Sequence, residues 1–345
     1  MIRFALIVAS TLGFVLTAAL GNLFVPLSGA LRPGRCERTN DTTDDTEKEP
    51  QNEPETPVVP EIGGVCIAVG VLAAVGVGWT AACVARPDIL GSESQLTSRL
   101  LIALLGALAF GAVGLADDAV RLRRRSTLGL HAPVRLALEL AAGAAVLGLL
   151  ALRDCLADGF TLPGVGYIAL GRAAPVVWEL LLTALAECAH AANGADGTVC
   201  GAGFVAMLGL MGAMTLLGWF PLAVLPAAAA GSLMAFLLWN FPPARFRPGA
   251  AGCQLVAGLI GCVPLCIGWP GITVPLALPF WLEGGMLGLQ VLAVRCTHGR
   301  RGLFSTAPLH RWLEARGHSA VTIFYVFCLL AVVGFALAVQ AVKFS

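Results

Sequence analysis

Two adjacent carboxylates, Asp117 and Asp118, follow directly after a long apolar run, and the basic segment 121–125 (RLRRR) comes shortly after them. Carboxylates at the edge of a membrane are costly unless another group compensates their charge. A divalent cation is one such group, because Mg²⁺ prefers oxygen ligands and usually binds one or two carboxylates together with substrate phosphates. A helix end at which both acids pair with the arginines is the alternative. The pair alone leaves these two interpretations open.

Three further polar segments interrupt the apolar sequence: residues 190–197 (HAANGADG), 240–252 (NFPPARFRPGAAG) and 308–319 (PLHRWLEARGHS). The first favours a turn when taken alone, because Asn and Asp near Gly are typical of turns. The second is rich in Pro and Gly, and such irregular backbone is tolerated in a membrane where it lines a polar cavity. Together, the four polar segments indicate a site for an anionic substrate that is associated with a metal ion.

The composition defines the kind of scaffold that must position these residues. Hydrophobic residues make up 57% of the 345 residues and charged residues 12%, whereas a soluble domain carries about 25% charged residues. These values exclude a disordered protein, a fibrous protein and an ordinary cytosolic enzyme. The apolar runs are long and continuous, whereas a membrane β-barrel needs alternating polar and apolar residues. We therefore expect an all-α integral membrane protein in which residues 1–345 form a single polytopic domain.

Ten apolar stretches are long enough to cross the bilayer, which takes roughly 17–25 residues for about 30 Å of hydrocarbon. They span residues 4–27, 62–85, 99–116, 132–152, 173–191, 199–217, 219–239, 252–269, 272–294 and 320–342. Because Arg3 precedes the first stretch, it resembles a signal peptide, but its length and the nine later spans favour a retained helix.

Basic residues divide the loops of a ten-span protein into two sets. The loops after the odd-numbered spans carry 16 of the 22 Lys and Arg residues, and the other loops carry four. The positive-inside rule places the richer set in the cytoplasm and both termini outside. All four polar segments belong to the richer set, so we predict an active-site cleft on the cytoplasmic face, within reach of soluble substrates and of lipid.

Residues 37–61 differ from the rest of the chain, with nine acidic residues and four prolines. Such a segment buries too little apolar surface to order itself. We expect a disordered acidic cytoplasmic insertion.

The polar segments resemble the motifs of one known family. Asp117-Asp118-x-x-Arg121 and Gly129-Leu130-x-x-x-x-Arg135 are similar to the DDxxK and GLxxxxK motifs of the polyprenyl-phosphate N-acetylhexosamine-1-phosphate transferases. Within that superfamily the chain most resembles the phospho-N-acetylmuramoyl-pentapeptide transferases. Their motifs NAxNxxDGxDG, NxxPAxxFxGDxGS, PxHHHFExKGxS and PTMGG are similar to residues 190–197, 240–252, 308–319 and 60–64. The resemblance covers about residues 57–345.

This resemblance implies a fold and a reaction. It implies ten transmembrane helices and Mg²⁺-dependent transfer of a phospho-sugar from a UDP-sugar to undecaprenyl phosphate, with release of UMP. Both substrates are anions, so such a protein mainly positions them and neutralises their charge. The expected setting is the bacterial inner membrane, in the synthesis of peptidoglycan or another cell-envelope glycan. The resemblance also suggests a homodimer, and we expect no nucleic-acid partner.

The resemblance also assigns roles to individual residues. The catalytic residues it implies are Asp117, Asp118, Asp196 and His310, and the metal ligands are Asp117, Asp118 and Asp196. The substrate-binding residues it implies are Asn193, Arg121, Arg135, Asn240, Arg245 and Arg311.

The chain departs from the family motifs at several of these places. Ala250 and Val199 stand where the motifs have Asp, and the loss at Ala250 removes a carboxylate that the family uses at the metal. Other departures are His190 in place of Asn, Arg121 and Arg135 in place of Lys, and Arg311 and Trp312 in place of His. Two interpretations follow: a divergent transferase, or a catalytically degraded paralogue that binds polyprenyl phosphate or nucleotide-sugar and acts through partners. A transporter is less favoured, because transporter sites lie near the membrane midplane.

Overall fold

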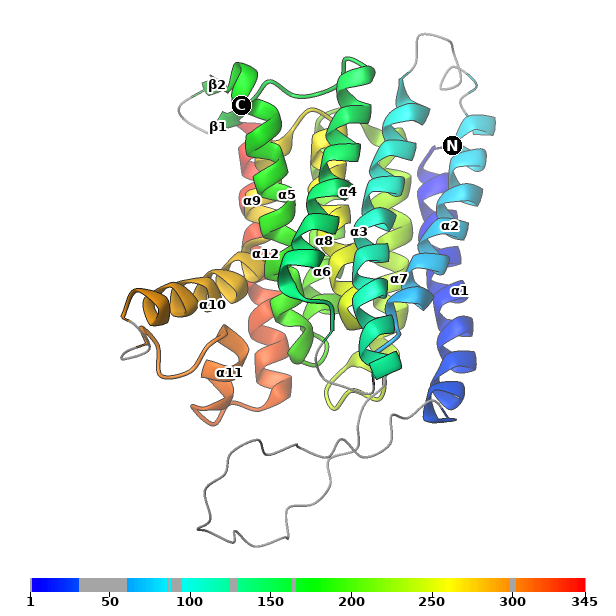
Figure 1. Cartoon of the computed structure of the whole chain (residues 1–345). Coiled ribbons are helices and arrows are strands. Elements are labelled where there is room, and N and C mark those ends of the chain that lie inside the picture. The colour runs from blue at the N-terminus through cyan, green and yellow to red at the C-terminus, as the bar shows by residue number, and fades with distance from the viewer. Residues whose placement is uncertain are drawn as a thin grey trace, which may run out of the picture.

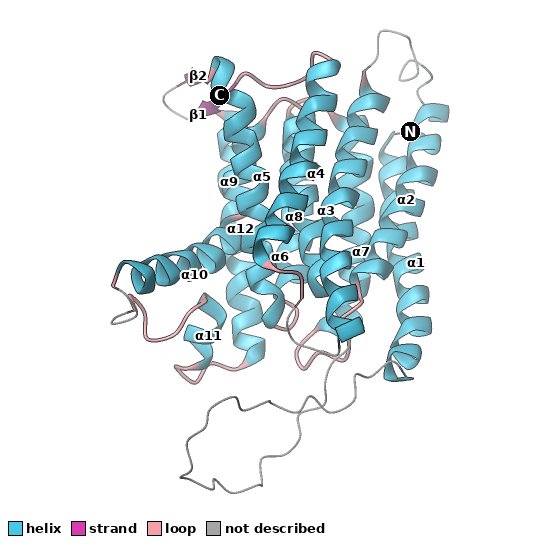
Figure 2. Cartoon of the chain, viewed as in Figure 1, coloured by secondary structure: helices cyan, strands magenta, loops and turns pink. Residues whose placement is uncertain are grey.

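The protein is described by a computed structural model that covers residues 2–30, 61–85, 87, 95–124, 129–162, 166–297 and 302–344. It is almost entirely helical (Figures 1 and 2). The long helices are α1 (Ile2–Ala30), α2 (Gly64–Ala85), α3 (Leu96–Arg124), α4 (Ala132–Leu152), α5 (Ala174–Ala191), α6 (Thr198–Leu216), α7 (Val224–Asn240), α8 (Gly249–Cys266), α10 (Leu278–Cys296) and α12 (Ala320–Lys343). Two short helices, α9 (Thr273–Leu276) and α11 (Leu309–Glu314), complete the set. The predicted acidic insertion lies outside the described residues, apart from Glu61.

Nine of the described helices are long and apolar enough to cross a membrane, and a bent pair makes a tenth if it is counted as one span. This agrees with the ten apolar stretches of the sequence. The bent pair, Pro270–Leu276 and Leu278–Cys296, turns by 76° within the predicted span 272–294. Pro279 stands in the first turn of α10, where its missing N–H cannot continue the preceding helix and its fixed φ suits a helix start. Helix α10 therefore points sideways out of the bundle (Figure 1).

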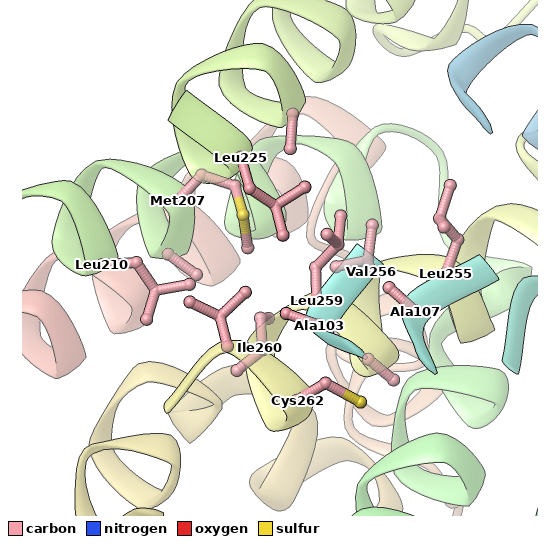
Figure 3. Packing of buried hydrophobic residues seen from close by; sticks show 14 of the residues in the cluster. Ala103, Ala107, Met207, Leu210, Leu225, Leu255, Val256, Leu259, Ile260 and Cys262 are labelled. Carbon is pink, nitrogen blue, oxygen red and sulfur yellow. The ribbon is translucent and has the colours of Figure 1, made fainter. Parts of the chain in front are cut away.

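Helix α8 forms the centre of the bundle and is buried over its whole length. Apart from Gln254 it carries only apolar and small residues, as expected for a helix that other helices surround, and it packs against α3, α5, α6 and α2. Figure 3 shows its residues Leu255, Val256, Leu259 and Ile260 among apolar side chains of the neighbouring helices.

Small residues bring α3 and α8 close together. A Cβ atom on Gly258 would lie 2.7 Å from Cα of Ala107, and one on Gly114 would lie 2.2 Å from the carbonyl oxygen of Ala250. Close backbone approach through small residues is the usual basis of helix packing in membranes. As a result, the C-terminal part of α3 lies directly against the N-terminus of α8.

Both chain termini lie at one end of the bundle, and the four polar segments lie at the other (Figure 1). An antiparallel hairpin of β1 (Gly159–Leu162) and β2 (Gly166–Ala169) lies at the end with the termini. Tyr167 in β2 donates a hydrogen bond to Asp158, which directly precedes β1, and this bond raises the pKa of the tyrosine. The same-side termini and the common location of the polar segments thus agree with the ten-span prediction.

The membrane orientation gives a first testable prediction. Reporter fusions after Arg125, Arg247 and Arg301 are expected to be cytoplasmic, and a fusion near Arg153 is expected to be external. The reason is that most basic residues lie in the loops after the odd-numbered spans, to which the first three positions belong. Paired alkaline phosphatase and fluorescent-protein fusions in cells measure this directly. A reversed pattern would place the polar segments away from soluble cytosolic substrates and would contradict the predicted site.

Candidate active site

The polar segments converge at one end of the bundle. They are carried by the C-terminal ends of α3, α5 and α7, the N-terminal ends of α4 and α8, and the short helix α11 (Figure 1). Hydrogen bonds and ion pairs connect residues that lie far apart in the sequence.

Asp118 joins α3 to α8. Its Oδ1 accepts a hydrogen bond from the backbone N–H of Ala250 at 3.0 Å, and its Oδ2 accepts one from Ala251 at 2.9 Å. The first N–H groups of a helix have no partner inside the helix, and a negative charge at this end is favourable. Asp118 is almost fully buried and therefore acts as a cap of α8 that comes from another helix.

Asp117 is fully buried and holds the loop between α3 and α4. Its Oδ1 accepts a hydrogen bond from the N–H of Leu130 at 2.6 Å, and its Oδ2 lies 2.8 Å from Nη2 of Arg121. A Cβ on Gly129 would lie 2.2 Å from Oδ1, so only glycine allows the loop this close to the carboxylate. The pairing of the acids with nearby arginines, one of the two sequence interpretations, is thus present at Asp117.

Two arginines meet at His190. Nε2 of His190 lies 3.4 Å from Nη2 of Arg121 and 3.3 Å from Nη1 of Arg135. A guanidinium only donates hydrogen bonds, so Nε2 is the acceptor of both and the imidazole is neutral, with its proton on Nδ1. Arg135 also forms a two-bond contact with Glu187, at 3.1 and 2.8 Å. His190, which replaces the Asn of the motif, therefore holds two guanidinium groups next to one another.

Asp196 joins the loop before α6 to the loop before α8. Its Oδ2 accepts a hydrogen bond from the N–H of Ala244 at 3.0 Å, and its Oδ1 contacts Nε and Nη2 of Arg247 at 2.9 and 2.8 Å. Nη1 of Arg247 lies 3.7 Å from Oε1 of Glu61, and Oε2 of Glu61 lies 3.5 Å from Nη1 of Arg121. Arg247 occupies the position of Phe in the family motif. The charges thus alternate from Asp117 to Asp196, through two arginines that share Glu61.

His310 is held by a carboxylate of the bent span. Its Nδ1 and its backbone N–H both contact the side chain of Glu283, which is fully buried in α10. A Cβ on Gly194 would lie 3.0 Å from Nε2 of His310, so this nitrogen faces the turn that carries Asn193. Glu283 thus fixes the orientation of the imidazole and leaves Nε2 directed toward the loop between α5 and α6.

The remaining predicted residues are less closely connected. Oδ1 of Asn193 lies 3.4 Å from the thiol of Cys253. Asn240 is buried and donates a hydrogen bond to the carbonyl of Phe246 at 3.1 Å, which closes its own loop. Arg245 and Arg311 are exposed. Among the contacts between described residues, these four do not join the charged network.

Sequence reasoning missed several polar residues that the structure places here. Glu61, Glu187 and Arg247 contact the predicted residues. Glu139 and Gln254 are fully buried and form a hydrogen bond of 2.5 Å between α4 and α8. Acidic side chains inside apolar spans are rare and mark functional sites. Glu139 and Glu283 both lie inside predicted apolar spans, so this criterion would have identified them from the sequence.

The described residues contain no group of three or more His, Cys, Asp or Glu side chains arranged to hold a metal ion. Asp117 and Asp196 each face a guanidinium, and Asp118 caps a helix. Ala250 and Val199, at the motif's other acidic positions, are buried and apolar. The donor set does not fit a preformed site of three protein carboxylates, and the Mg²⁺ requirement stays a prediction.

Comparisons with known proteins agree with this architecture. Residues 100–268 match the family described as Glycosyl transferase family 4. A phospho-N-acetylmuramoyl-pentapeptide-transferase from Mycobacterium sp. (strain KMS) is 30% identical over 307 residues, covering 81% of this chain and 83% of the relative. A protein of the same name from Halalkalibacterium halodurans is 26% identical to this chain, and the match covers 92% of each. Another from Geobacillus kaustophilus is also 26% identical, and the match covers 96% of this chain and 97% of the relative.

The fold and the site together define a multi-pass helical membrane protein with arginines and carboxylates gathered at one end of its bundle. The similarity over most of the chain is more specific. The chain belongs to the family of phospho-N-acetylmuramoyl-pentapeptide transferases.

Proposed function

We propose that this protein transfers a phospho-sugar of the phospho-N-acetylmuramoyl-pentapeptide type from a UDP-sugar to undecaprenyl phosphate and releases UMP. The relatives named for this transferase activity match the chain over most of its length, which supports a role in peptidoglycan or related cell-envelope synthesis. The bacterial inner membrane is the proposed location. A homodimer stays a prediction.

The observation that carries this proposal is the pair of guanidinium groups that meet at His190, beside the buried Asp117. In the reaction, an oxygen of the lipid phosphate forms a bond to the sugar-linked phosphorus, and the bond from that phosphorus to the bridging oxygen of UMP breaks. Both reactants are anionic, so the protein must offset their repulsion and hold them in line. Arg121 and Arg135 supply the positive charge that phosphate oxygens need here, while Glu187 holds Nε and Nη2 of Arg135 in place.

His310 adds a group that can hold or move a proton. Its Nδ1 is occupied by Glu283, so only Nε2 is available to a reacting oxygen or to a phosphate. This arrangement, in which a carboxylate orients an imidazole, is typical of general acid–base sites. No step of the reaction is assigned to Mg²⁺, because the described residues contain no group of three or more side chains arranged to hold a metal ion.

A second function is favoured by a separate observation. Ala250 and Val199 stand at two positions where the family motifs have a carboxylate. The remaining carboxylates, Asp117, Asp118 and Asp196, contact arginines or backbone N–H groups. A paralogue that binds polyprenyl phosphate or a nucleotide-sugar without turnover would keep this arrangement.

An exchange assay distinguishes the two functions. Purified protein in detergent or nanodiscs is supplied with UDP-N-acetylmuramoyl-pentapeptide, undecaprenyl phosphate and Mg²⁺, and UMP is measured by chromatography. The transferase proposal expects UMP release that depends on the lipid phosphate. Binding of either substrate without UMP release would support the paralogue instead.

A further inference from the structure

We infer that Arg121 and Arg247 supply the positive charge at this site, so that it binds the diphosphate of a nucleotide without a protein-bound divalent cation. The inference rests on the proposed function for the identity of the ligand. It concerns five residues in one alternating chain of charges: Asp117, Arg121, Glu61, Arg247 and Asp196.

The two outer carboxylates already have a cation. Asp117 lies 2.8 Å from the guanidinium of Arg121, and Asp196 lies 2.8 Å from that of Arg247. A divalent cation bound to either carboxylate would stand next to an arginine and be repelled by it, because Coulomb energy at such short range is large even when it is partly screened. Ala250 is fully buried and offers no oxygen ligand from its side chain. The positive charge at this place therefore comes from the side chains of Arg121 and Arg247, and not from a bound ion.

The two arginines keep donors for a further anion. A guanidinium has five N–H donors, and Arg247 directs Nε and Nη2 to Asp196. Among the described residues, Nη1 of each arginine contacts Glu61, at 3.5 Å from Arg121 and 3.7 Å from Arg247, so an anion that replaces Glu61 can bind these two nitrogens. The side chains of Arg121 and Arg247 are 23% and 28% exposed, so a ligand can reach both. Planar guanidinium forks match the geometry of phosphate oxygens.

Glu61 occupies the place between the two arginines where a phosphate would bind. Its carboxylate lies 3.5 Å from Arg121 and 3.7 Å from Arg247, longer than the contacts of either arginine with its aspartate. It is also the more exposed partner, at 35%. A diphosphate carries more charge than this carboxylate and forms charge-assisted hydrogen bonds of the stronger kind. A diphosphate therefore displaces Glu61 while the contacts of Asp117 and Asp196 persist.

The test is calorimetric titration of the purified full-length protein with UDP, once in EDTA and once in Mg²⁺. We expect affinities that agree within about threefold, since fixed charges need no ion. Arg247→Phe, which introduces the residue of the family motif, should weaken binding in EDTA by about tenfold or more. Glu61→Gln should strengthen it, because the competing carboxylate is lost. Arg172→Gln is the matched control and should bind UDP like the unmodified protein, because Arg172 lies in the short helix Gly171–Ala173 directly after β2, at the opposite end of the bundle.

The outcomes separate this inference from the proposed function. UDP binding in EDTA without UMP release in the exchange assay would support the inference and reject the transferase. Turnover together with UDP binding that requires Mg²⁺ would support the transferase and overturn the inference. Failure to bind UDP in either condition would overturn the inference. The unfolding temperature of each variant shows whether it folds. If Arg247→Phe does not fold, Arg247→Lys takes its place, with a smaller expected loss of affinity.

Discussion

Replacing Asp117 by Asn is expected to reduce UMP release by about 10²-fold or more, the size of effect seen when one electrostatic element of a catalytic site is removed. Asp117 is fully buried and contacts both Arg121 and the N–H of Leu130. An asparagine keeps the shape and can still accept the bond from Leu130. It cannot neutralise Arg121, which would then turn toward Glu61 or His190 and lose its orientation toward the phosphates.

The measurement is the exchange assay on Asp117→Asn and on a control of the same chemistry. Asp158→Asn is that control, because Asp158 directly precedes β1 and accepts a hydrogen bond from Tyr167 in β2, at the opposite end of the bundle. The control should release UMP at the unmodified rate. Unchanged turnover in Asp117→Asn would refute the assignment of this site. Loss of turnover with an unchanged unfolding temperature would place the effect in catalysis.

The second large effect is expected at His310 and Glu283. His310→Asn should lower kcat by about 10²–10⁴-fold, the usual contribution of a general acid or base, with a small change in KM. Glu283→Gln should lower kcat less, because the imidazole remains but a carboxylate no longer fixes its orientation. Glu283 is a positioning residue that acts through His310.

A double-variant cycle tests this relation. If Glu283 acts only through His310, adding Glu283→Gln to His310→Asn should cost little more activity. Additive losses would show that Glu283 has a separate, structural role. His318→Asn provides the control, since His318 is exposed beyond the end of α11 and should be replaceable without loss of kcat.

Much of the fold is readable from the sequence because crossing a bilayer imposes a length and an apolar composition on each helix. The first eight apolar stretches and the last each correspond to a helix, and the ninth corresponds to the bent pair. Counted as ten, the spans form an even number, which agrees with the location of both termini at the same end of the bundle. The positions of the polar segments are also readable, since most charged residues lie between the apolar runs, with Glu139 and Glu283 among the exceptions. Boundaries were less exact: α3 continues to Arg124, beyond the predicted end at residue 116, so Asp117 and Arg121 pair within one helix.

The partners of the charged residues were decided by tertiary packing. Nothing in the spacing of the sequence shows that Asp118 caps α8, since this depends on small residues that bring α3 and α8 together at Gly114 and Gly258. Glu283 meets His310 because α10 bends away from the bundle, which its hydropathy does not indicate. Local patterns determine which segments enter the membrane, whereas contacts between helices determine which charges neutralise one another, because such contacts join residues that are distant along the chain.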